Sequence, residues 1–150
     1  MELSETQRLV QASARDVARR VLAPVAAELD RTGEFPEAPL RELAGLGLMG
    51  VNVPARFGGA EAGVVAYSLA LQEIAAACAS TAVTMAVTNM VAEVIAHFGS
   101  EAQRAAYLPK LCSGEFVAGA FALSESSAGS DPGSLRTRAV RDGEGWVLSG

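Results

Sequence analysis

The sequence has few of the residues that mark several common classes of protein. Its two cysteines, Cys78 and Cys112, are too few for a disulfide framework and are not spaced like metal ligands. Its 12 basic residues do not cluster and are outnumbered by 17 acidic ones, which argues against nucleic-acid binding as the main task. The acidic, polar N-terminus is unlike a signal or transit peptide. We therefore predict a cytoplasmic protein of a reducing compartment, with no bound metal.

Apolar residues are plentiful by contrast, at 50% of the chain, so a sizeable core can form. The longest apolar stretch, residues 81–98, is interrupted by Asn89, Glu93 and His97, which recur four residues apart and so share one helical face. A polar stripe of this kind is costly in lipid and ordinary in a protein core. We interpret the stretch as a buried helix and expect no membrane association.

The first 114 residues have the pattern of a helical bundle. Capping boxes begin helices at Ser4 and Ser100, Pro24 predicts a kink or break, and Pro109 is expected to disrupt the last turn of the final helix. The apolar residues of 45–60 predict a packed loop. The expected buried stripes are Val10, Ala14, Val17, Val21, Val25 and Leu29 at the start; Val64, Tyr67, Leu71, Ile74 and Cys78 in a third helix; and Val83, Val87, Met90, Val94 and Phe98 in a fourth.

After Gly114 the pattern changes to that of strands. Residues 116–124 predict a buried strand, 126–134 a loop, and 135–150 a hairpin that turns at Asp142-Gly143. One strand and a hairpin make a poor sheet alone, because three or more strands are usually needed. The fold class is therefore mainly α: a helical domain over 1–114, then the first strands of an antiparallel β domain over 115–150, as the front portion of a longer polypeptide.

The segment 121–131 (FALSESSAGSD) carries the sharpest chemical signal. A strand that ends in hydroxyl residues presents backbone N–H groups and side-chain hydroxyls in a row. Gly129 would let the backbone pass close to a ligand, and Ser130 offers a further hydroxyl. Such a ledge could hold a flat heterocycle rich in carbonyls, or a pyrophosphate, without any cationic side chain. An ordinary surface turn explains the same composition.

The block AFALSESSAGSDPGSLRTRA, followed by GEGWVLSG, resembles the flavin-binding signature of the acyl-CoA dehydrogenase family. The resemblance extends back through LREL, GLGLMGV and HFGSEAQRAAYLPKLCSGE, and so covers nearly the whole chain. It implies an enzyme that holds FAD between the β domain and a second, C-terminal helical domain, which this chain lacks. The implied reaction oxidises the Cα–Cβ bond of an acyl-CoA thioester: a carboxylate removes the α proton, and the β hydride passes to flavin N5.

The resemblance also assigns residues. The backbones of Phe121 and Leu123 and the hydroxyl and amide of Ser124 should meet the pyrimidine edge of the flavin. Gly129 and Ser130 belong to the same cofactor site, with Ser130 beside the pyrophosphate and the pantetheine arm of the substrate. Ser126 stands where the family usually has proline. The base glutamate of the family lies in the C-terminal helical domain, so we expect no catalytic residue here and an inactive 150-residue chain.

Other side chains have structural as well as functional interpretations. Glu125 could act as a base, but is better explained as a brace for the loop. Glu93, with Asn89 and His97, could line an acyl pocket or form the polar edge of its helix. Both cysteines suit the core, and Trp146 suits a core or sheet-face anchor rather than a flavin stacker. Three arginines could approach a nucleotide phosphate, although an exposed strand face explains them better: Arg136, Arg138 and Arg141.

The resemblance further implies an acyl-CoA substrate, an electron-transferring flavoprotein as electron acceptor and a homotetramer. Two alternatives remain at this stage. One is a flavoprotein of the same fold with other chemistry: an acyl-carrier-protein dehydrogenase, a monooxygenase or a nitroalkane oxidase. The other is a truncated, non-catalytic paralogue that serves as an assembly partner through apolar surfaces left exposed.

Overall fold

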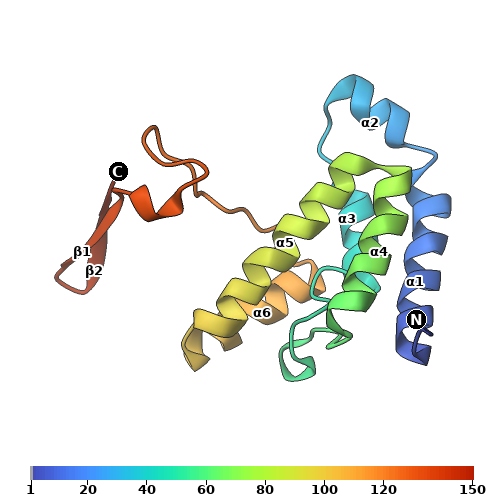
Figure 1. Ribbon diagram of the computed structural model, residues 1–150, viewed down its shortest axis with the longest axis horizontal. Helices are drawn as coiled ribbons and strands as arrows, with labels where there is room; N and C mark the ends of the chain where they lie inside the picture. The colour runs from blue at the N-terminus through green and yellow to red at the C-terminus, as the bar shows by residue number, and fades with distance from the viewer. Residues whose placement is uncertain (1) are drawn as a thin grey trace. The chain divides into compact units, whose positions relative to one another are not determined.

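The computed structural model describes residues 2–150, which form two compact units, one ending at Ala120 and one running from Phe121 to Gly150 (Figure 1). The first unit is helical and the second contains a β-hairpin. The elements are α1 Glu5–Val17, a π-helix Ala18–Leu22, α2 Ala26–Thr32, α3 Glu37–Gly45, a short 3-10 helix Ala55–Phe57, α4 Gly63–Ala77, α5 Ala79–Phe98, α6 Glu101–Ser113, a second 3-10 helix Pro132–Ser134, β1 Arg138–Asp142 and β2 Gly145–Ser149.

The helix boundaries follow the sequence signals except at one proline. Both capping boxes are present: the Ser4 hydroxyl accepts from the Gln7 N–H at 3.2 Å while the Gln7 side chain accepts from the Ser4 N–H at 2.9 Å, and Ser100 begins α6 in the same way. Pro24 lies in the turn before α2, as predicted. Pro109, however, lies inside α6, which continues to Ser113, so that prediction was wrong. Buried residues on both sides of the proline hold the helix in place despite the lost N–H.

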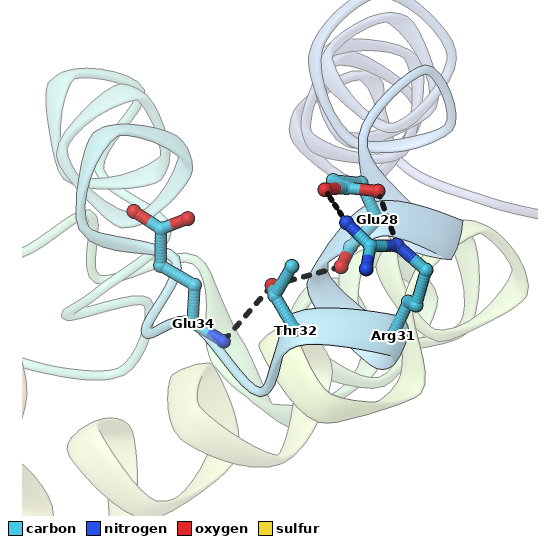
Figure 2. A network of polar contacts seen from close by, with 4 residues as sticks. All are labelled: Glu28, Arg31, Thr32 and Glu34. Carbon is cyan, nitrogen blue, oxygen red and sulfur yellow. Dashed lines mark hydrogen bonds and ion pairs between the residues drawn. The ribbon is translucent and has the colours of Figure 1, made fainter.

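α2 ends in a small polar network (Figure 2). The Thr32 hydroxyl donates to the Glu28 carbonyl at 2.9 Å and accepts from the Glu34 N–H at 3.3 Å, while Arg31 pairs with the Glu28 carboxylate. Gly33 follows at φ 69°, the left-handed conformation that commonly ends a helix. The chain thereby turns from α2 toward α3.

The helical unit has two cores. One brings together buried side chains of α1, α3, α4 and α5 with the loop after α3, and the other joins that loop to α5 and α6. The loop 45–60 is packed as predicted: Leu48, Met49, Val51, Val53 and Phe57 are all buried. Asn89 of α5 fastens it, since its Oδ1 accepts from the Val51 N–H and its Nδ2 donates to the Leu48 carbonyl, both at 2.8 Å.

These two hydrogen bonds of Asn89 explain why α5 buries the face opposite to the predicted one. The face around Asn89 is buried, because the loop backbone needs partners that an apolar face cannot supply. Most of the predicted apolar stripe is exposed instead, with Val83 62% and Phe98 86% exposed, and Met90 and Val94 also exposed. By length and composition α5 could cross a membrane, a property that it shares with core helices.

The predicted stripe of α4 is confirmed in part: Ile74 and Cys78 are buried, and Tyr67 and Leu71 pack against the core. Val64 is 70% exposed, and the buried positions are Ala66, Ala70 and Ile74. The small alanine side chains allow close approach of the neighbouring helices, α1 and α5, both of which contact α4. The predicted stripe therefore marked the core-facing side of this helix except at Val64, and it omitted the buried Ala66 and Ala70.

The strand predicted for residues 116–124 is absent, since the structure assigns these residues no regular element. No neighbouring strand in the described chain offers them a hydrogen-bonding edge. Part of the segment lies against α5, where the Gly119 N–H donates to the Thr88 hydroxyl at 3.0 Å. The hairpin is confirmed: β1 and β2 are antiparallel, with Val140 opposite Val147, and Gly143 takes φ 60° in the turn.

Candidate functional site

The hydroxyl-rich segment forms a tight turn at the start of the second unit. The Glu125 N–H donates to the Ala128 carbonyl at 2.9 Å, and the Ala128 N–H donates back at 3.2 Å. Ser126 and Ser127 occupy the tip, and Ala128 is the only buried residue of 121–150, all of which the structure describes. The turn gives the preceding Ser124 a fixed place at its base.

The Glu125 carboxylate holds this turn to the start of the hairpin. One oxygen accepts from the Arg136 N–H at 2.8 Å, and the other accepts from both the N–H of Thr137, at 2.9 Å, and its hydroxyl. These hydrogen bonds, the Thr137 hydroxyl foremost, lower the pKa of the Glu125 carboxyl because they favour its charged form. Glu125 is therefore a brace, as the sequence analysis favoured, and its two oxygens accept three hydrogen bonds.

A pocket of about 800 Å³ opens between the turn and the start of the hairpin. Among its walls are Leu123 and Ser124, whereas Phe121, Gly129 and Ser130 do not line it. Ser124 is exposed, and within the described chain neither its N–H nor its hydroxyl has a hydrogen-bond partner. The lining residues are Ala122, Leu123, Ser124, Glu125, Ser126, Ser127, Leu135, Arg136, Thr137 and Gly150.

These features fit the edge of a flavin ring. The ring presents carbonyl oxygens and nitrogens that accept hydrogen bonds, and the turn offers an N–H and a hydroxyl from Ser124 that are free to donate. A Cβ placed on Gly129 would meet no other atom of the chain within 4 Å, so open space adjoins that backbone. The free donors of Ser124 and the pocket that it lines are compatible with the edge of a bound isoalloxazine.

One lining residue corrects the expectation of a site without cations. Arg136 lies in the pocket wall, directly after Leu135 and before the Thr137 that Glu125 holds. Its backbone N–H is fixed by Glu125, and within residues 2–150 its guanidinium is in no ion pair. The sequence placed Arg136 and Thr137 close after the loop 126–134, but the hydrogen bonds that join them to Glu125 are visible only in the structure.

Glu93 lies elsewhere, in the helical unit. Its carboxylate accepts from the Asn52 side chain at 2.6 Å, and burial, with the charge of Glu93, raises the pKa of Tyr67. His97 is exposed, with Nδ1 2.8 Å from the Glu93 carbonyl. Glu93 is thus half-buried within a polar cluster at the edge of α5, and it belongs to a different unit from Ser124.

The remaining candidates have structural positions. Cys78 and Cys112 are both buried, as expected for core residues. Burial raises the pKa of Cys112; at Cys78 burial acts in the same direction, but hydrogen bonds from Ser80 and Thr81 outweigh it and lower the pKa. Arg138 is on the exposed strand face, as favoured. Trp146 is 63% exposed on the hairpin, so it is no core anchor within the described residues.

Helices followed by a hairpin, with a hydroxyl-rich loop between them, define an acyl-CoA dehydrogenase-like fold. The family profile described as acyl-CoA dehydrogenase, N-terminal domain, matches residues 4–115. The chain belongs to this family.

Two relatives illustrate the similarity in sequence. The chain is 42% identical over 151 aligned residues to the mitochondrial short-chain specific acyl-CoA dehydrogenase of Bos taurus, and 40% identical over the same length to an acyl-CoA dehydrogenase of Bacillus subtilis. Both alignments cover 100% of this chain, but only 36% and 40% of the relatives. The chain therefore spans less than half the length of these relatives.

Solved structures agree over the whole chain. A chain from the study of the electron transferring flavoprotein of Acidaminococcus fermentans superposes with a TM-score of 0.93 at 30% identity. Butyryl-CoA dehydrogenase of Megasphaera elsdenii gives 0.90 at 32% identity, and this chain covers 40% of each of those two chains. A glutaryl-CoA dehydrogenase of Mycobacterium smegmatis in complex with FADH2 gives 0.90 at 31%, with 99% of this chain and 38% of that one covered.

Proposed function

We propose that this protein takes part in FAD-dependent α,β-dehydrogenation of an acyl-CoA thioester, and that residues 121–130 form part of its flavin site. One observation carries the proposal: Ser124 offers an N–H and a hydroxyl with no partner in the described chain, on a turn that Glu125 holds rigid. Membership of the family and the FADH2-bound neighbour support the choice of cofactor.

In this proposal FAD, when bound, accepts the β hydride of the substrate. The Ser124 hydroxyl and amide, with the backbones of Phe121 and Leu123, donate to the pyrimidine edge, where negative charge develops. A preorganised donor of this kind typically contributes about 3 kcal/mol to transition-state stabilisation. Gly129 allows close approach of the backbone, and Ser130 holds the pyrophosphate and the pantetheine arm. We assign no catalytic base within these 150 residues.

The proposal extends to partners and location. The similarity to short-chain specific acyl-CoA dehydrogenases supports an acyl-CoA substrate, and the neighbour from the study of an electron transferring flavoprotein supports that class of protein as acceptor. We further infer a homotetrameric assembly and a cytoplasmic location without membrane attachment. Size-exclusion chromatography with light scattering tests the assembly, and reduction of the acceptor protein in a coupled assay tests the partner.

The test of the site is Ser124→Ala in the flavin-loaded protein. Loss of one donor should slow flavin reduction by an acyl-CoA at least about tenfold, measured by anaerobic stopped-flow absorbance. Ser68→Ala, at an exposed position of α4, is the matched control and should react like the parent protein. Equal reduction rates for the two variants would contradict the assignment of Ser124.

A second candidate function rests on the exposed apolar side chains of α5 and the hairpin, such as Val83 and Leu148, which are 62% and 72% exposed. A non-catalytic assembly partner would use such surfaces to associate. It would be colourless after purification and would self-associate, whereas a yellow protein that bleaches with acyl-CoA supports the dehydrogenase. Same-fold flavoproteins with other chemistry would be yellow and fail to bleach.

A further inference from the structure

We infer that Arg136 provides a positive charge to the pocket of Ser124 and thereby favours the reduced state of a flavin bound there. The inference rests on the proposed function and adds a residue to that site. Arg136 and Ser124 line the same pocket, although they are 12 positions apart in the sequence. The other hairpin arginines, Arg138 and Arg141, do not line it.

The backbone of Arg136 is held in place. Its N–H donates to the Glu125 carboxylate at 2.8 Å, and the next residue, Thr137, donates to the same carboxylate through its N–H at 2.9 Å and through its hydroxyl. Two adjacent residues are thus tied to the turn that bears Ser124. The start of the Arg136 side chain therefore has a defined position at the pocket wall rather than that of a free surface residue.

Glu125 does not cancel the charge of Arg136 by direct pairing. The two carboxylate oxygens accept three hydrogen bonds, all from backbone N–H groups or from the Thr137 hydroxyl, and none comes from the Arg136 guanidinium. Within residues 2–150 the guanidinium is in no ion pair, whereas Arg15, Arg31 and Arg41 all are. The arginine side chain stays protonated at all ordinary pH values, so its charge is permanent.

A positive charge in this pocket would favour the reduction of a bound flavin. Glu125 is the other charged residue in the pocket wall, and a carboxylate alone would disfavour the arrival of electrons at a bound ring. Arg136 is hydrogen-bonded through its backbone to Glu125, and its guanidinium supplies a charge of opposite sign at the same pocket, which offsets that effect. Because the pocket is open to water, the interaction is screened, and we expect a change of about tenfold in the equilibrium between oxidised and reduced cofactor.

The experiment measures the flavin midpoint potential of the purified, flavin-loaded protein and of three variants. Arg136→Gln removes the charge, Arg136→Lys keeps it, and Arg138→Gln makes the same change of net charge two residues away, outside the pocket wall. We expect Arg136→Gln to lower the potential by about 30 mV, which is tenfold for a two-electron couple, and both other variants to stay near the parent value. Flavin affinity, from quenching of flavin fluorescence, is measured in parallel.

The outcomes separate this inference from the proposed function. Weaker flavin binding in Arg136→Gln with an unchanged midpoint potential would overturn the inference, because the charge would then act on cofactor binding and not on the balance between the oxidised and reduced states. Equal potentials and affinities for Arg136→Gln and Arg138→Gln would overturn it while leaving the flavin site intact. A parent protein that binds no flavin would overturn both. Amide NMR signals of Thr137 report whether the Glu125 brace survives in each variant.

Discussion

The two units of this chain are held together by different interactions. The helical unit buries large apolar side chains completely, among them Leu22, Ile74 and Met85. The side chain of its buried Asn89 accepts one hydrogen bond and donates two. The unit from Phe121 to Gly150 buries only Ala128 among its residues, all of them described, and its order depends on hydrogen bonds around Glu125. The comparison teaches that a packed helical unit and a hydrogen-bonded loop can share a short chain and yet respond to different perturbations.

The largest contrast between the units should come from truncating a core residue. Ile74→Ala removes a fully buried side chain from α4 and should lower the free energy of unfolding of the helical unit by about 4 kcal/mol. Leu148→Ala, at a residue 72% exposed on the hairpin, is the control and should change it by less than about 0.5 kcal/mol. Urea unfolding followed by far-UV circular dichroism measures both, and similar losses would break the comparison.

A polar residue of the core should give a smaller effect of the same kind. Asn89→Leu leaves the Val51 N–H and the Leu48 carbonyl without their partners in a dry interior, which should cost about 3 kcal/mol. Asn52→Ala, at a part-buried residue of the same loop, is the comparison variant. Native-state hydrogen exchange at Val51 should speed up in Asn89→Leu and not in Asn52→Ala. Slow exchange in both variants would show that other contacts hold the loop.

The loop unit should respond to pH instead. The hydrogen bonds to Glu125 lower the pKa of its carboxyl below the unfolded value, so its stabilising effect is fully present above the unfolded pKa and is lost as the pH falls through the folded pKa. An NMR titration should show the Arg136 and Thr137 amide signals shifting together at acid pH, while the Val51 signal stays constant. Glu125→Gln should abolish this titration. Persistence of the shift in that variant would assign it to another group.

The sequence predicts the local elements well where the signal is carried by a few adjacent residues. Both capping boxes, the break near Pro24, the packed loop and the Asp142-Gly143 turn need only local chemistry, and all are present. The orientation of α5 was wrong because hydrophobic periodicity assumes that polar residues face water. Asn89 faces inward because its side chain binds the backbone of a loop 38 residues earlier in the chain. The short sequence windows used to judge periodicity do not contain both partners.

In the candidate site, too, features set by adjacent residues were predicted and those that depend on distant partners were not. The loop and the role of Glu125 as a brace follow from local composition and from the family resemblance, and the structure places Leu123 and Ser124 on one pocket. The position of Arg136 in the pocket wall did not follow, because it depends on the hydrogen bonds that Arg136 and Thr137 make to Glu125. The positions of Phe121, Gly129 and Ser130 relative to a ligand remain predictions from the resemblance.

The place of Trp146 has a practical consequence. It is the sole tryptophan of the chain and it lies on the hairpin, whereas every α-helix among the described residues lies in the other unit. Intrinsic fluorescence excited at the indole band therefore reports on one unit, and the helical ellipticity reports on its neighbour. The two signals can be recorded in one temperature-jump experiment, which would show whether the two units unfold at the same rate.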